Sequence, residues 1–381
     1  MLGTWFARLP EVRVQLGLSY GELGAALLAQ MIGVIIAMQL AESLFIRFGS
    51  ARVVRAGAMF VPWFLPLLAL SHGPAEATGG LFAWGLAAGV LDVGMNAAGV
   101  RTEKLARRPI LNSLHAVWGA GALLGSLLTA FAVRSGLAPR PHFLIIALAL
   151  SALAAVSGRY LLSDDQQAPE AASPHGRAMT RLVSYLRGGW TLPVIVLGML
   201  GAAEAIAETS VSSWCGIFLT GQRAAPASLA SLGYTAFIAA ETGTRLAGDW
   251  LHQRLGPVLL VRISVAVTVA GLIAVIAVPS PWLDIPGFAV QGCGIAVLAP
   301  IITGAAGHGA RDGSAASLAI ARFSTLYYAG AMAGPALTGW LAQELGLATA
   351  FGLLILPLAL IALLAAAVTP AGAMRDPAPV A

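Results

Sequence analysis

The sequence contains few charged residues. Only 10% of its 381 residues are Asp, Glu, Lys or Arg, whereas soluble globular chains carry about a quarter. Lysine is nearly missing, since Lys104 is the single lysine among 22 basic residues, while 58% of the chain is hydrophobic. This balance excludes a disordered, collagen-like or ordinary soluble protein. It predicts a chain that lies in a lipid bilayer.

The motifs of soluble enzymes are also missing. The sequence has no H-E-x-x-H and no phosphate-binding loop with lysine, and its six histidines are scattered. Residues 17–21 (GLSYG) fit the G-x-S-x-G pattern of hydrolases, but no strand precedes them. The two cysteines lie inside apolar stretches, as small buried hydrophobes do. We therefore expect no enzymatic activity, no metal, no cofactor and no nucleic-acid partner.

Long apolar runs dominate the chain. A membrane-spanning helix requires about 20 mostly apolar residues. Eleven runs of this kind occur, separated by segments rich in Pro, Gly and charge: residues 22–45, 53–72, 79–101, 112–133, 142–162, 190–219, 226–248, 257–279, 285–307, 314–342 and 347–369. The sequence therefore predicts an all-α polytopic membrane protein with eleven full spans.

The longest polar interval divides these spans unevenly, five before and six after. The first ten residues have the pattern of the last two turns of another helix, which is too short to span a bilayer. We therefore expect a six-plus-six design whose first helix is mostly missing, through truncation or a misassigned start codon. The predicted parts are an N-terminal bundle at 1–162, a linker at 163–189, a C-terminal bundle at 190–369 and a tail at 370–381.

Basic residues fall mainly on one side of the predicted membrane. Arg245 and Arg322 lie inside helices, and only five arginines lie in segments on the poorer side: Arg8, Arg13, Arg134, Arg140 and Arg223. The remaining fifteen of the 22 basic residues lie on the other side. Because loops rich in Lys and Arg stay in the cytoplasm, the linker and the C-terminal tail are expected to be cytoplasmic.

Two stretches with related patterns occur, one in each half of the chain. They are residues 245–257 (RLAGDWLHQRLGP) and residues 42–52 (ESLFIRFGSAR). The pair resembles the cytoplasmic loop motif of the major facilitator superfamily. The first copy departs from the motif at Glu42 and Ile46, where the family usually has Gly and Asp. The resemblance implies a fold of two helical bundles, a central cavity and transport by alternating access.

Three further stretches narrow the resemblance: residues 92–96 (DVGMN), 108–121 (RPILNSLHAVWGAG) and 208–214 (ETSVSSW). They are similar to the fucose-permease-like branch, and closest to bacterial inner-membrane members whose substrates are poorly defined. This implies a bacterial inner-membrane protein with a sugar or related polar metabolite as its substrate. In the fucose permeases the acidic residue corresponding to Asp92 takes part in proton coupling.

Several polar side chains fall near the membrane centre. A carboxylate there costs on the order of 3 kcal/mol, so its presence indicates a specific role. Glu204 and Glu208 lie four residues apart on one helix face. Two ionised carboxylates there would repel, so one is expected to be protonated. The candidate proton and substrate residues are Asp92, Asn96, His115, Trp118, Glu204, Glu208 and Trp214. The alternative is that these residues have structural roles: hydrogen bonding between helices, helix packing or anchoring at the membrane interface.

A second polar group falls in the cytoplasmic third. Glu241, Arg245 and Asp249 follow one another at intervals of four, so Arg245 can pair with either acid. We expect an inner gate whose ion pairs form when the cavity opens outward and break when it opens inward. Its candidate residues are Glu42, Arg47, Glu103, Glu241, Arg245, Asp249, Arg254 and Arg322. Static links between the halves are the alternative and, for Arg322, binding of an anionic substrate.

The leading hypothesis is a monomeric secondary active transporter in the lipid bilayer. It would move a small-molecule substrate by alternating access, driven by protons because the sequence offers no ATP site. Two alternatives are an efflux antiporter for drugs or metabolites and a non-transporting membrane receptor or scaffold.

Overall fold

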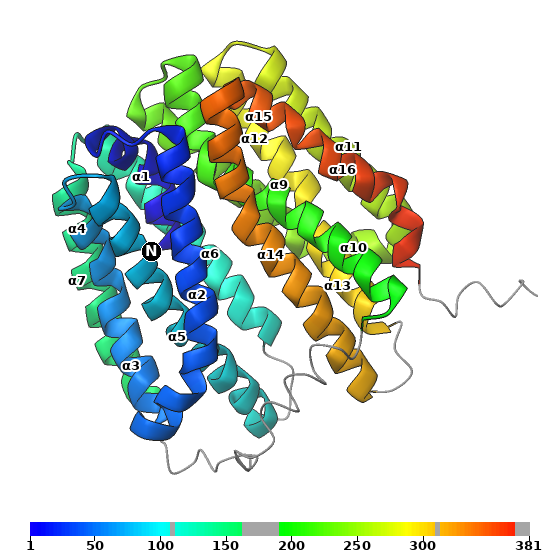
Figure 1. Cartoon of the computed structure of the whole chain (residues 1–381), viewed down its shortest axis with the longest axis horizontal. Helices are drawn as coiled ribbons and strands as arrows, with labels where there is room; N and C mark the ends of the chain where they lie inside the picture. The colour runs from blue at the N-terminus through cyan, green and yellow to red at the C-terminus, as the bar shows by residue number, and fades with distance from the viewer. Residues whose placement is uncertain (107–110, 162–189, 309–312, 370–381) are drawn as a thin grey trace, which may run out of the picture. The chain divides into compact units, whose positions relative to one another are not determined.

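A computed structural model describes residues 1–106, 111–161, 190–308 and 313–369 (Figure 1). Within these ranges the chain forms α-helices and short 3-10 turns, and it contains no strand there. Among the described residues, eight helical stretches are long and apolar enough to cross a membrane. The prediction of an all-α chain is therefore confirmed for the described residues, while the count of eleven full spans stays a prediction. The expected linker at 163–189 and tail at 370–381 lie outside the described residues.

The helices follow the apolar runs of the sequence. The first half contains α1 (Leu2–Gln15), α2 (Tyr20–Phe48), α3 (Ser50–Phe60), α4 (Phe64–Ala69), α5 (Pro74–Ala106), α6 (Leu111–Arg134) and α7 (Pro139–Ser157). The second half contains α9 (Leu192–Arg223), α10 (Ala227–Leu255), α11 (Pro257–Ala277), α12 (Pro281–Ile295), α13 (Leu298–His308), α14 (Gly313–Leu345), α15 (Leu347–Leu353) and α16 (Ile355–Leu363). Short 3-10 turns include η1 (Val61–Trp63), η2 (Gly158–Tyr160) and η5 (Ala365–Val368).

Internal contacts divide the chain into two compact units. Unit 1 contains Met1–Glu170, Ser213–Ile238 and Pro335–Leu347. Unit 2 contains Ala171–Ser212, Ala239–Gly334 and Ala348–Ala381. Three helices, α9, α10 and α14, are therefore shared, since one end of each packs with the N-terminal helices in unit 1. This division differs from the expected bundle boundaries at 162 and 190, which stay a prediction.

The first helix extends beyond the segment that the sequence suggested. The pattern indicated a helix end near Pro10, whereas α1 contains Pro10 and continues to Gln15. The buried Arg8 side chain ties α1 to α7, since its Nε donates to His142 Nδ1 at 3.4 Å and its Nη2 donates to the Leu137 carbonyl at 2.5 Å. Arg8 also pairs with Glu11 on its own helix. These interactions compensate the cost of burying the guanidinium.

Ser19 begins α2. Its Oγ accepts a hydrogen bond from the Glu22 backbone N–H at 3.2 Å, and the Glu22 carboxylate accepts one from the Ser19 N–H at 2.9 Å. This reciprocal arrangement is a capping box, which satisfies two backbone donors at a helix start. The G-x-S-x-G pattern therefore specifies a helix N-terminus here.

Glycines set the close packing of α2 against α5 in unit 1, where the two helices lie side by side (Figure 1). A Cβ at Gly85 would collide with the Gln30 carbonyl oxygen, and one at Gly33 would collide with the Phe82 carbonyl oxygen. Only glycine lets the two backbones approach this closely.

Gly85→Ala is expected to destabilise the protein by about 1–3 kcal/mol, because the added methyl group meets a rigid backbone carbonyl. Gly79, on the same helix, has open space where a Cβ would be added, with nothing within 4 Å. The control Gly79→Ala should therefore be neutral or slightly stabilising. Thermal unfolding in detergent measures both variants, and equal shifts would contradict this account of the helix contact.

In unit 2, α9 and α14 approach each other in the same way. A Cβ at Gly330 would collide with the Ala202 carbonyl oxygen, and one at Gly334 would lie 2.8 Å from that of Ile206. A second feature of unit 2 is the two-residue turn at residues 296–297, where α12 ends and α13 begins. Both features position the charged side chains described next.

Candidate functional site

Five polar side chains from three helices of unit 2 form a cluster, which we call the carboxyl cluster. Helix α9 supplies Glu204 and Glu208, α10 supplies Glu241 and Arg245, and α14 supplies Tyr327. The first four come as two i, i+4 pairs, so each helix presents two ionisable groups on one face. The close approach of α9 and α14 at Gly330 and Gly334 brings the third helix to them.

Arg245 is the centre of the carboxyl cluster. Its Nη2 lies 2.5 Å from Glu241 Oε1 and 3.7 Å from Glu208 Oε1. The Glu241 side chain is 1% exposed, whereas those of Glu208 and Arg245 are 20% and 40% exposed. The Glu241–Arg245 pair is therefore the tight, buried interaction. Glu208 is the carboxylate that solvent can reach.

Glu204 is fully buried one turn before Glu208. Within the described part of the chain, neither of its carboxyl oxygens has a hydrogen-bond partner. An ionised carboxylate without hydrogen bonds is costly in such an environment. The cluster thus contains three carboxyl groups and one guanidinium, and its most buried carboxyl group lacks a direct ion pair among the described residues.

Tyr327 connects α14 to the carboxyl cluster. Its hydroxyl donates a hydrogen bond to Glu208 Oε2 at 3.4 Å. Its ring stacks on Phe323, with ring centroids 5.9 Å apart, and meets Tyr328 edge-on at 5.7 Å. The aromatic contacts hold the phenol in place, so the hydroxyl is positioned against the more accessible carboxylate.

The interruption between α12 and α13 supplies a fourth element. Arg245 Nε donates to the Ala296 carbonyl oxygen at 3.2 Å. This carbonyl belongs to the C-cap residue of α12, where the regular helix hydrogen bonding ends. The Arg245 guanidinium therefore links α9, α10 and the turn between α12 and α13. Protonation of a carboxylate that pairs with it changes the contacts of all three elements.

The structure brings together part of the predicted gate and part of the predicted proton site. Glu241 and Arg245 were expected in the gate, and Glu204 and Glu208 in the proton site, yet all four lie in one cluster. Asp249, the other acid expected to pair with Arg245, is exposed and makes no ion pair with described residues. Of the two acids that the spacing allowed, Arg245 therefore pairs with Glu241 and not with Asp249.

Three of the other predicted gate residues are arginines with aromatic neighbours. Arg254 and Arg47 are exposed, with their guanidinium groups over the rings of Trp250 and Phe48 at 4.6 and 5.3 Å. Arg322 is buried on α14, and its guanidinium lies 5.2 Å from the Trp190 ring. Glu103 is half-buried on α5. The Glu42 side chain lies outside the described residues.

Of the first-half candidates, Asp92 is half-buried on α5. Asn96 is exposed one turn later, and its Nδ2 donates to the backbone carbonyl of Asp92 at 3.0 Å. Trp118 is an exposed residue of α6, while the His115 side chain lies outside the described residues. Asp92 and Asn96 therefore share a helix face, as their spacing suggested.

Trp214 lies in a packed contact inside unit 1. Its indole N–H donates to the Pro335 carbonyl at 3.0 Å, and its ring meets Tyr20 edge-on at 5.8 Å. Nearby, Phe6 of α1 packs on Tyr234 of α10 with centroids 5.3 Å apart. Trp214 is fully buried, so in this conformation it forms a contact between helices α2, α9 and α14.

The sequence analysis did not identify Tyr327 of the carboxyl cluster or the Ala296 carbonyl that Arg245 contacts. Tyr327 stands in an apolar helix five residues after Arg322, and a tyrosine there needs a partner for its hydroxyl. A tyrosine in an apolar helix was therefore the sequence feature that could have indicated this member of the cluster. Backbone carbonyls carry no signal in the sequence, and nothing marked residues 296–297 as a helix break.

Comparison with known proteins adds family information. A family model described as Major Facilitator Superfamily matches residues 3–318. An uncharacterised MFS-type transporter of Yersinia pestis is 31% identical over 368 residues, which cover 97% of this chain and 92% of the relative. The membrane protein MosC of Rhizobium meliloti is 26% identical over 353 residues, covering 92% and 82% of the two chains.

Solved structures with a similar fold include a mutant form of the nucleoside transporter NupG. It superposes with a TM-score of 0.77 at 15% identity and 96% coverage of both chains. A D-xylose-proton symporter superposes with a TM-score of 0.71 at 13% identity, covering 96% of this chain and 94% of the symporter. At these identities the likeness establishes the fold.

Proposed function

The chain belongs to the Major Facilitator Superfamily and is a multi-pass membrane transporter, not an enzyme; from this premise we propose that it couples the movement of a small polar solute to protons. The transporter would work by alternating access in a bacterial inner membrane, as a monomer of two helical bundles at 1–162 and 190–369. The linker and tail would face the cytoplasm, with eleven full spans.

The observation that carries this proposal is the charge imbalance of the carboxyl cluster. Three carboxyl groups, those of Glu204, Glu208 and Glu241, lie with one guanidinium inside a helical unit. Ionising all three would leave uncompensated negative charge at low dielectric constant. The least costly state holds at least one proton, which is what a proton carrier requires.

Glu208 is the proposed exchange point for that proton. It is the more exposed of the two α9 carboxyl groups, and it touches both Tyr327 and Arg245. When Glu208 is protonated, its attraction for Arg245 is lost and the guanidinium pairs with Glu241 alone. Because Arg245 also binds the Ala296 carbonyl, protonation changes the balance of contacts at a broken helix. We propose that this coupling links the proton to the conformational change.

The contacts around Trp214 support a closed outer side. In unit 1 the N-terminal helices α1 and α2 pack on the ends of α9, α10 and α14 through pairs such as Phe6–Tyr234 and Tyr20–Trp214. The basic-residue bias assigns these ends to the outer face. Alternating access would require these aromatic contacts to separate, while gate contacts other than the Glu241–Arg245 pair, which is already present, would form.

The proposed solute is a sugar or a related hydroxyl-rich metabolite. The two solved structures are described as a nucleoside transporter and a D-xylose-proton symporter, and both named solutes carry several hydroxyl groups. The Glu208 carboxylate, which is the most exposed of the three, the Arg245 guanidinium and the Tyr327 phenol can hydrogen-bond to such groups.

Uptake into proteoliposomes with an imposed pH gradient tests the function. Radiolabelled sugars and nucleosides are offered outside an alkaline lumen, with the membrane potential clamped at zero. Accumulation that collapses with a protonophore supports symport. Gradient-driven movement toward the acidic side would instead establish antiport. Equal rates with and without a gradient for every solute offered would contradict proton coupling.

Asp92→Asn is expected to lower proton-driven accumulation several-fold, because the variant keeps the size of the side chain and loses its charge at mid-membrane depth. The control is Glu76→Gln on the same helix, an exposed carboxylate that contacts His72 at the helix start. Both variants are compared in the same pH-gradient uptake assay. Undiminished accumulation in Asp92→Asn would remove Asp92 from the coupling mechanism.

A further inference from the structure

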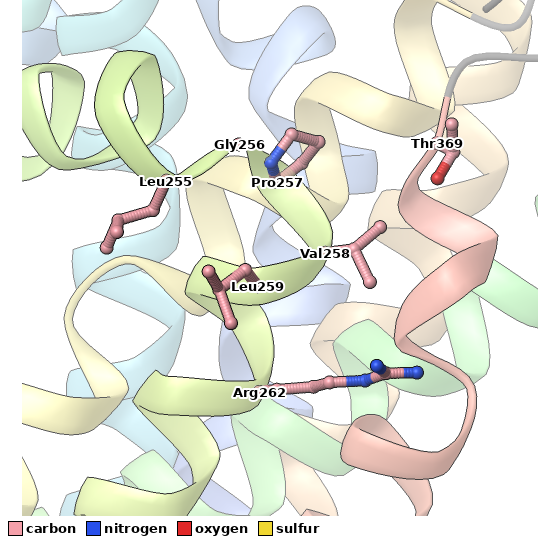
Figure 2. A pocket seen from close by; sticks show the side chains of 7 residues that line it. All are labelled: Leu255, Gly256, Pro257, Val258, Leu259, Arg262 and Thr369. Carbon is pink, nitrogen blue, oxygen red and sulfur yellow. The ribbon is translucent and has the colours of Figure 1, made fainter.

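A pocket of 340 Å³ lies at the turn that joins α10 to α11 in unit 2 (Figure 2). It is lined by Leu255, Gly256, Pro257, Val258, Leu259, Arg262 and Thr369. Gly256 forms the turn with a φ of +70°, in the left-handed region that glycine adopts without strain. The turn therefore places apolar side chains from both helix ends around one opening, none of which belongs to the carboxyl cluster.

The position of the pocket at the start of a candidate span predicts that it lies at the depth of the lipid headgroups. Helix α11 is a candidate membrane span over Pro257–Ala277, so its first residues lie where the hydrocarbon region ends. Below the pocket, exposed apolar side chains continue along the span on α11 and its neighbour α16: Leu259, Ile263, Leu363 and Leu364. Figure 1 shows these two helices side by side. An opening that contains Arg262 and Thr369, next to an apolar stripe, matches the chemistry of a phospholipid headgroup and its chains.

Charge in the pocket is of one sign. Arg262 is exposed, and it makes no hydrogen bond or ion pair with the described residues. Its side chain extends from α11 toward the C-terminal segment that carries Thr369 (Figure 2). No carboxylate lines the pocket, and His252 and Arg254 lie in the last turn of α10 beside it. An occupant with net negative charge is therefore favoured.

We propose that this pocket binds the headgroup phosphate of an anionic phospholipid. The guanidinium of Arg262 offers a planar pair of donors that fits phosphate oxygens, and the Thr369 hydroxyl offers a further donor. Val258 and Leu259 contact the glycerol backbone and the first acyl carbons, and the apolar stripe on α11 and α16 receives the chains. The bound lipid joins the α10–α11 turn to the C-terminal end of the described chain.

Native mass spectrometry and thermal unfolding of the purified full chain test this site. Phosphatidylglycerol added to the detergent-solubilised protein is expected to be retained and to raise the melting temperature, whereas phosphatidylcholine is not. Arg262→Gln should weaken phosphatidylglycerol retention roughly tenfold, the factor that one charge-assisted hydrogen bond supplies. Val258→Trp fills the pocket and should cause the same loss without removing a charge.

The matched control is Arg159→Gln, which removes an exposed arginine from η2 at the end of another predicted span and should leave retention unchanged. Equal loss in Arg159→Gln and Arg262→Gln would mean charge attraction without a site, and would overturn the proposal. Equal retention of phosphatidylcholine would overturn it as well. Glycerol 3-phosphate is the third arm, because protection by this soluble phosphate to the same extent would assign the pocket to a free phosphate ligand instead of a lipid.

Discussion

Glu208→Gln is expected to abolish proton-driven accumulation of the solute, while exchange of solute across the membrane persists. Glutamine has the size of a protonated glutamate and can still accept the hydrogen bond that Tyr327 donates. It cannot release or take up a proton. For one proton per solute, a gradient of two pH units supports about hundredfold accumulation. The variant should therefore fall from about hundredfold to no accumulation at all.

The measurement is the ratio of internal to external solute at steady state, followed by counterflow of labelled against unlabelled solute without a gradient. Glu344→Gln serves as the control, because it removes an exposed carboxylate from α14, which also carries Tyr327. Accumulation by Glu208→Gln at the level of this control would contradict the assignment. If Glu204→Gln alone abolished accumulation, the proton would instead be exchanged at the buried member of the pair.

The helices could be predicted from the sequence because lipid imposes a simple rule on the chain. A backbone that crosses hydrocarbon must satisfy its own hydrogen bonds, so apolar runs of sufficient length become helices. Each of the eleven runs coincides with one helix or with consecutive ones. The continuation of α1 past Pro10 was not predictable from the run itself. Past Pro10, Val12 is buried and Gln15 Nε2 donates to the Ala69 carbonyl oxygen at 2.9 Å, which are tertiary contacts.

The candidate site could be predicted only as far as local spacing reaches. Glu204 with Glu208, and Glu241 with Arg245, are i, i+4 pairs that any helix brings together. Which two helices face each other depends on tertiary packing. From the sequence we therefore assigned one pair to a proton site and the other to a gate, and predicted either of two acids as the partner of Arg245. The close approach at Gly330 and Gly334, a tertiary feature, adds Tyr327 to the cluster.

A joined cluster has a mechanistic consequence. If Arg245 is shared between Glu208 and Glu241, the protonation of one carboxylate alters the pairing of the other. The same guanidinium binds Ala296 at the break between α12 and α13. A proton-dependent change therefore needs no long pathway, since one side chain contacts both the proposed proton acceptor and the turn between α12 and α13.

Arg245→Gln is expected to destabilise the protein by about 3–5 kcal/mol, because it leaves the buried Glu241 carboxylate without its partner. The glutamine is also too short to restore the contact with Ala296. Thermal unfolding can be followed by the reaction of Cys215 with a thiol dye, since this cysteine is buried, in a Cys293→Ser background that removes the exposed thiol. The midpoint temperature should fall clearly below that of the parent.

The double variant Arg245→Gln/Glu241→Gln should recover a large part of this loss, because two neutral amides in contact need no counter-charge. Asp249→Asn is the matched control on the same helix, and it should change stability by less than about 0.5 kcal/mol because Asp249 is exposed. Rescue of Arg245→Gln by Asp249→Asn, and not by Glu241→Gln, would reassign the arginine to the gate pairing that the sequence also allowed. Recovery of stability without recovery of transport would mean that the guanidinium serves the conformational change in addition to holding the helices together.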